Sequence, residues 1–135
     1  MDMHIIYENN SVHEIGMHFI FCTKYRKNVF IDVVEIELKN ILCQTCAEYG
    51  WKVQALETMP DHVHIFLQIG HQDRPVDIVR TLKSISAVYI FTKFPELKGR
   101  KFWGSGLWSN STYYGSVGNI SEEVVKKYIE NQKNK

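Results

Sequence analysis

The sequence predicts an α+β fold: a ferredoxin-like (RRM-like) antiparallel sheet with two helices on one face and an added C-terminal helix. Three observations favour it. Strand and helix patterns follow one another in the order β-α-β-β-α-β. The second and third strand patterns are separated only by the short turn Met59-Pro60-Asp61, which is typical of a hairpin. The length of 135 residues and the 44% hydrophobic content suit one globular domain, so we expect a single domain over residues 1–135.

The first strand and the first helix are indicated by the N-terminal half of the chain. Residues 16–25 are mostly apolar and predict a buried strand. Asp32 followed three residues later by Glu35 has the spacing of an N-cap with its return partner. Gly50 suits the position just after a helix, where the backbone turns left-handed. Between these ends one helical stripe recurs at Val34, Leu38, Ile41, Leu42 and Thr45.

The hairpin and the second helix follow. Residues 51–58 and 62–69 both alternate as strands. Asp73 and Pro75 then open a helix that we expect to run to about Phe94, because proline is accommodated in a first helical turn and another proline follows this segment.

The last strand and the final helix complete the order. A polar, basic loop leads to a strand over residues 107–114, and Gly115 and Gly118 are expected to break the chain. Ser121 is a good N-cap for the final helix. One inward stripe of that helix comprises Val125, Tyr128, Ile129 and Gln132.

Two histidines on one predicted strand are the most informative candidates for a site. His62 and His64 are two residues apart, so they project from the same face, while the apolar residues between and after them point to the core. Two adjacent imidazoles can hold a divalent metal ion. In the predicted topology this strand is central and the final helix covers its open face, which would bring Tyr128 and Gln132 to the histidines. The alternative for that helix is an ordinary buried stripe, with Gln132 at its rim.

This combination supports phosphodiester chemistry. A metal ion held by two imidazoles and an amide oxygen leaves positions open for a phosphodiester, which the Tyr128 hydroxyl can attack to form a covalent phosphotyrosine. Because amide and phosphate oxygens are hard ligands, we expect Mg²⁺ or Mn²⁺ rather than zinc.

The chain resembles the small single-tyrosine HUH transposases of bacterial and archaeal insertion sequences. This resemblance implies that His62 and His64 are metal ligands, Tyr128 is the nucleophile and Gln132 is the third ligand. It also implies cleavage of single-stranded DNA with a 5′-phosphotyrosine intermediate, binding of DNA hairpins at the element ends, and a homodimer whose last helix completes the partner's site in trans. The similar stretches are residues 18–26, 59–64, 107–118 and 122–132.

Two other functions stay open on the residues alone. One is an RRM-like module that binds single-stranded nucleic acid on surface aromatics without catalysis. The other is a metal hydrolase that uses water, with Tyr128 in a structural role. Trp103 and Trp108 could stack on bases, although tryptophans at such positions are more often core or dimer contacts.

Composition adds limits. The net charge of +1 gives no general electrostatic argument for nucleic acid. Cys43 and Cys46 form a C-x-x-C without a second pair, which does not favour a zinc or redox site. The chain has no apolar run long enough to span a membrane and no signal-peptide pattern at its start, so we expect a cytoplasmic protein without membrane contact.

Overall fold

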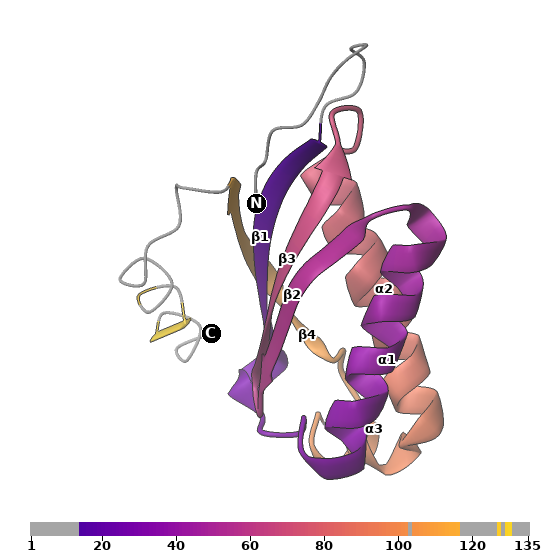
Figure 1. Cartoon of the computed structure of the whole chain (residues 1–135). Helices are drawn as coiled ribbons and strands as arrows, with labels where there is room; N and C mark the ends of the chain where they lie inside the picture. Colours follow the sequence, from indigo (N-terminus) through magenta and orange to yellow (C-terminus); the bar gives the residue numbers. More distant parts are fainter. Residues whose placement is uncertain (1–13, 103, 117–126, 128, 131–135) are drawn as a thin grey trace.

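The computed structural model describes residues 14–102, 104–116, 127, 129 and 130, and its centre is a four-stranded antiparallel sheet with helices on one face (Figure 1). The strand order is β2-β3-β1-β4, so β1 and β3 are central, as the sequence predicted for a ferredoxin-like fold. The elements are β1 (Glu14–Thr23), η1 (Lys24–Arg26), α1 (Asp32–Tyr49), β2 (Lys52–Met59), β3 (His62–Gly70), α2 (Pro75–Lys93), α3 (Pro95–Arg100) and β4 (Trp108–Ser116).

The core lies between the sheet and the helices. Alternate residues of the two central strands point into it and are fully buried, because a strand turns successive side chains to opposite faces. The helices contribute one stripe each, including Leu38 and Leu42 from α1 and Ile78 and Leu82 from α2. The strand residues concerned are Phe19, Phe21, Val63, Ile65 and Leu67.

Helix α1 confirms the predicted stripe but corrects its start. Asp32 is the first helical residue with φ +54°, Ile31 occupies the N-cap, and no side chain caps the helix. Glu35 does not fold back on the cap, because its carboxylate accepts a 2.5 Å hydrogen bond from the Thr58 hydroxyl on β2. Gly50 ends the helix at φ +80°, as predicted.

Three further boundaries differ from the sequence prediction. β1 stops at Thr23, and the next residues turn in η1 with Tyr25 at φ +62° and Arg26 at φ +51°. The stretch predicted as a loop contains α3, because Pro95 opens a new helical turn. Gly115 does not break the chain but pairs with His18 inside β4.

Two residues of α2, Lys83 and Ser86, form three hydrogen bonds with β4. The Trp108 indole Nε1 donates to the Ser86 hydroxyl at 2.9 Å. The Lys83 ammonium donates to the carbonyls of Ser109 and Ser111 at 2.8 and 3.2 Å, where the β1–β4 register shifts. Burial lowers the pKa of Lys83 to about 8. No helix in the described part of the chain is long and apolar enough to cross a membrane.

Candidate active site

His62 and His64 lie side by side on β3, on the sheet face that points away from α1 and α2. Their strand neighbours Val63 and Ile65 are fully buried on the helix side, so the predicted division of this strand between two faces is confirmed. On β1, Cys22 lies opposite His62 and Ile20 lies opposite His64. The two imidazoles therefore stand on β3, which has a neighbouring strand on each side.

A third histidine belongs to this group. Nδ1 of His18 and Nε2 of His64 are 2.7 Å apart, so one of the two nitrogens donates to the other. The His18 ring also stacks on Phe66, with centroids 4.5 Å apart and planes within 6°. Burial lowers the pKa of both histidines, helped by His64 for His18 and by His62 for His64, while Glu57 opposes the shift at His64. Both imidazoles are thus favoured in the neutral form, which is the form that binds metals.

His62 is held from the opposite side by a carboxylate. Its Nδ1 lies 2.9 Å from Oδ1 of Asp61, and because an ionised carboxylate only accepts hydrogen bonds, Nδ1 carries the proton. Oδ2 of the same carboxylate accepts a hydrogen bond from Nε of Arg26 at 2.6 Å, and Nη2 of Arg26 forms an ion pair with the same oxygen at 2.5 Å. Nε2 of His62 is left with its lone pair, so it is the atom of this ring that can bind a metal ion.

The turn before β3 is anchored to the end of β1. The backbone carbonyl of Asp61 accepts from the backbone N–H of Thr23 at 2.9 Å, and the carbonyl of Pro60 accepts from Val29 and Phe30. The buried Thr23 hydroxyl donates to the Lys27 carbonyl at 2.9 Å. These contacts fix Asp61 beside η1, where Arg26 can reach its side chain.

The C-terminal segment also reaches this group. Nη1 of Arg26 donates to the backbone carbonyl of Ile129 at 2.5 Å. Lys127, Ile129 and Glu130 are helical and lie on the side of the sheet opposite α1 and α2 (Figure 1). The predicted site residues Tyr128 and Gln132, like Ser121 and Gly118, are outside the described residues.

The donors present suit a metal ion only in part. Among the described residues no three histidine, cysteine or acidic side chains lie close enough to hold one. The imidazoles of His62 and His64, the first of them oriented by a carboxylate, provide two ligands of the kind found in histidine-based sites. A third ligand from another residue type, such as the amide of Gln132, fits this arrangement.

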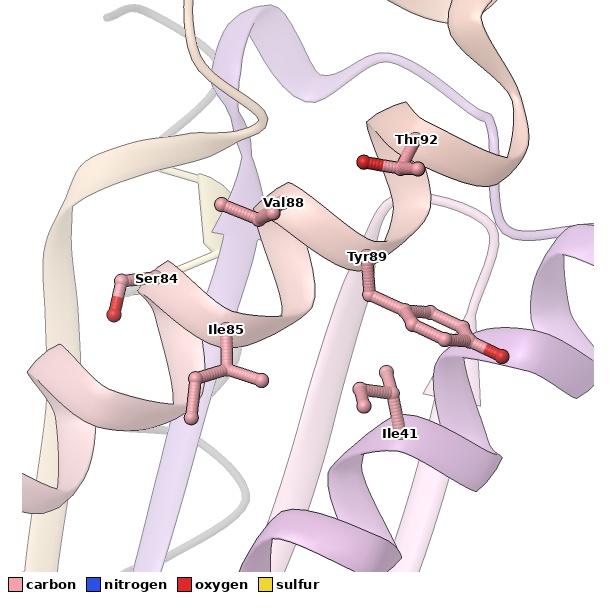
Figure 2. A pocket seen from close by; sticks show the side chains of 6 residues that line it. All are labelled: Ile41, Ser84, Ile85, Val88, Tyr89 and Thr92. Carbon is pink, nitrogen blue, oxygen red and sulfur yellow. The ribbon is translucent and has the colours of Figure 1, made fainter.

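An apolar pocket occurs elsewhere and is a different feature. Figure 2 shows it on the helix layer, along the outer side of α2 and beside α1. The Tyr89 hydroxyl at this pocket donates to Glu37 at 2.7 Å. No imidazole lines it, and the sheet separates it from the histidines, so we assign it no part in the candidate chemistry. Its lining residues are Ile41, Ser84, Ile85, Val88, Tyr89 and Thr92.

Burial decides two weaker candidates from the sequence, base stacking by Trp108 and a site at the cysteine pair. Trp108 is only 7% exposed and packs edge-on against Phe21 with ring centroids 5.5 Å apart, so it is a core residue and not a stacking surface. Trp103 is outside the described residues. Cys46 is buried and Cys43 is exposed, so the two thiols do not form one accessible site.

The fold and the histidine pair define a class of proteins, and comparison with known proteins identifies that class. The family model described as "Transposase IS200 like" matches residues 11–132. The chain therefore belongs to the IS200-like transposases of insertion sequences, as its sequence resemblance implied.

Individual relatives support the same family. The chain is 39% identical over 124 residues to the ISDra2 transposase TnpA of Deinococcus radiodurans, covering 92% of this chain and 88% of the relative. It is 25% identical over 115 residues to the transposase of insertion sequence element IS200 of Salmonella typhimurium, covering 85% and 74%. A crystal structure of a Deinococcus radiodurans protein described as a candidate transposase superposes with a TM-score of 0.86 at 37% identity, covering 95% of this chain and 98% of that one.

A more distant structure shares the fold alone. A REP-associated tyrosine transposase, solved bound to a REP hairpin, superposes with a TM-score of 0.57 at 14% identity, covering 94% of this chain and 68% of that one.

Proposed function

We propose that this transposase cleaves and rejoins single-stranded DNA through a 5′-phosphotyrosine intermediate on Tyr128. The observation that carries the proposal is the imidazole pair of His62 and His64 on the open face, with Ile129, the neighbour of Tyr128, bonded to the Arg26 that also holds the Asp61–His62 contact. A nucleophile on this segment would approach a phosphodiester bound at the histidines.

The chain's own residues would divide the chemistry as follows. Nε2 of His62, one nitrogen of His64 and the amide oxygen of Gln132 would hold Mg²⁺ or Mn²⁺, which when bound neutralises the phosphate and stabilises charge that develops on its oxygens. The Tyr128 hydroxyl gives up its proton as its oxygen forms a bond to phosphorus, and the bond from phosphorus to the 3′-oxygen breaks. The 3′-oxygen leaves as a hydroxyl after taking up a proton. Because the phosphotyrosine keeps an ester bond, attack by another 3′-hydroxyl reverses the step and joins strands.

The DNA and the assembly belong to the same proposal. We expect the substrate to be single-stranded DNA with hairpins at the element ends, in line with the hairpin bound to the distant fold neighbour. We also expect a homodimer in which the C-terminal segment of one chain completes the site of the other. The Arg26–Ile129 bond is seen within one chain, and the same bond could form between two chains after the segments exchange.

A second candidate rests on the aromatic residues of the open face. Phe66 on β3 and Tyr113 on β4, which lies opposite Ile20, are both partly exposed there. An RRM-like binder would stack bases on such rings without cutting the strand.

The test is Tyr128→Phe, assayed on single-stranded DNA from the element ends with Mg²⁺ or Mn²⁺. Wild-type protein should form a covalent adduct that survives denaturing electrophoresis. The variant should form none while binding the hairpin with nearly wild-type affinity, because it lacks only the hydroxyl. A covalent adduct in the variant would show that another residue is the nucleophile. Binding without any adduct in the wild type would favour the RRM-like module.

A further inference from the structure

The contact between Arg26 and Asp61 joins two parts of the proposed site that are far apart in sequence. Asp61 uses both carboxylate oxygens, one for Nδ1 of His62 and one for Arg26. Arg26 uses three nitrogens, two for Asp61 and one for the Ile129 carbonyl. A single guanidinium thus links the orientation of His62 to the location of the segment that carries Tyr128.

The Arg26–Asp61 pair is largely buried and is held by the surrounding backbone. Both side chains are only 14% exposed, so solvent screens the interaction less than it screens a surface ion pair. Arg26 and its neighbour Tyr25 hold positive φ angles, which non-glycine residues adopt only where the surroundings enforce them. The enforcing contacts include the backbone N–H of Lys24 donating to Leu107 and that of Thr23 donating to Asp61.

The chemistry of the three groups sets what each one does. The Asp61 carboxylate can only accept, so it fixes the proton of His62 on Nδ1 and leaves Nε2 as the ligand atom. Arg26 holds the carboxylate in place through Nε and Nη2, which lie on one side of its planar guanidinium. Its third nitrogen, Nη1, faces the carbonyl of Ile129. A lysine has one nitrogen in place of three, so it cannot present separate nitrogens to Asp61 and to Ile129 in this geometry.

We propose that Arg26 and Asp61 are positioning residues that hold His62 in its ligand orientation and fasten the C-terminal segment beside it. This inference rests on the proposed function, because it takes His62 as a metal ligand and Tyr128 as the nucleophile. Asp61 acts mainly on the histidine, and Arg26 acts on both.

The first test measures metal binding by calorimetry with Mn²⁺ on full-length protein without DNA. In Asp61→Asn, an amide oxygen facing Arg26 turns the NH₂ group toward His62, which drives the imidazole proton to Nε2. We expect a 10- to 100-fold loss of Mn²⁺ affinity, the usual range for removing a partner of a metal-binding histidine. Asp77→Asn is the matched control, because this exposed carboxylate at the start of α2 pairs with Arg80 away from the site. It should bind Mn²⁺ like the wild type.

The second test measures the hold on the C-terminal segment. Glu130 is exposed and provides a cleavage point for a glutamate-specific protease. Arg26→Gln should be cut after Glu130 several-fold faster than the wild type and should also lose Mn²⁺ affinity. Arg26→Lys should restore part of the affinity but not the resistance to cleavage. Lys24→Gln is the control for charge, because it also removes one positive charge from this turn. The Lys24 ammonium lies over the Tyr25 ring, 5.7 Å from its centroid, and not against Asp61.

The outcomes distinguish failure of the positioning role from failure of the metal site itself. If His62→Ala abolishes Mn²⁺ binding but Asp61→Asn binds like the wild type, the positioning role is refuted and the metal site stands. If His62→Ala itself leaves Mn²⁺ affinity unchanged, the metal site of the proposed function is refuted. If Arg26→Gln and Lys24→Gln are cut at the wild-type rate, Arg26 does not fasten the segment. Far-ultraviolet circular dichroism of each variant verifies that the fold is retained.

Discussion

The hydrogen bond between Trp108 and Ser86 allows a sharp test of how β4 is held against the helix layer. Ser86 is 1% exposed, and its hydroxyl accepts from the indole Nε1 while donating to the Leu82 carbonyl one turn earlier at 2.6 Å. Ser86→Ala removes that hydroxyl and leaves a buried N–H without its acceptor. Such an unsatisfied group costs about 1–3 kcal/mol, so we expect the free energy of unfolding to fall by about 2 kcal/mol.

The loss of stability expected for Ser86→Ala depends on the presence of Trp108, so a double-mutant cycle on these two residues tests the reasoning directly. In Trp108→Phe the buried donor is absent, so a further Ser86→Ala change loses only the helical contact to Leu82. We expect it to cost about 0.5 kcal/mol there, which leaves a coupling energy of about 1–2 kcal/mol between the two residues. Urea unfolding followed by circular dichroism at 222 nm measures all four proteins.

Additive costs within about 0.3 kcal/mol would refute the reasoning, since the two side chains would then not depend on each other. The same proteins address base stacking. Because Trp108 is buried against Phe21, Ser86→Ala should bind hairpin DNA like the wild type below its unfolding transition. A loss of DNA affinity in Trp108→Phe that exceeds its loss of folded protein would instead support a stacking role.

The remaining predictions concern ligands, thiols and assembly. His62→Ala or His64→Ala should abolish metal-dependent cleavage with less than about 1 kcal/mol loss of stability, because neither side chain fills the helix-side core; adduct formation and urea unfolding measure the two effects. One thiol, that of Cys43, should react quickly with Ellman's reagent at pH 8, because Cys22 and Cys46 are buried. Burial raises the pKa of Cys46 to about 12, so its neutral form stabilises the fold fully below pH 9 and this contribution is lost as the pH rises above that value. The stability gap between wild type and Cys46→Ala should therefore narrow by about 1 kcal/mol from pH 8 to pH 10 in urea unfolding. Mixing Tyr128→Phe with the double variant His62→Ala, His64→Ala should restore some cleavage if sites are completed in trans; no recovery after verified subunit exchange would exclude that arrangement.

The site residues that the sequence predicted are those governed by local periodicity. His62 and His64 could be placed on one face because a strand alternates with period two, and the buried Val63 and Ile65 confirm the phase. Element order then placed this strand at the centre of the sheet. These inferences use only neighbours in sequence and a topology with few alternatives.

The partners of the histidines were not predicted, because they depend on contacts between distant residues. His18 is 46 positions from His64, and Arg26 is 35 positions from Asp61. Pairing them requires the register of β1 against β3 and the path of η1, neither of which local periodicity specifies. The same limit explains why the predicted N-cap at Asp32 is wrong. The Glu35 carboxylate, which was expected to fold back on the cap, instead accepts a hydrogen bond from Thr58 on β2.

The hydrophobic core itself enforces the geometry of the candidate site. A one-residue slip of β3 against its neighbours would turn Val63, Ile65 and Leu67 to the open face and drive the histidines into the core. Exposing three such side chains costs about 1.5–3 kcal/mol each, before any penalty for burying imidazoles without partners. The sum is comparable to the whole stability of a small domain, so the slipped register is not populated. The open face can therefore carry polar, partly exposed groups that contribute little to folding, because the opposite face of the same strand determines where they stand. A nucleophile on a separate segment then needs only a local attachment to reach them, and the bond from Arg26 to Ile129 is such an attachment.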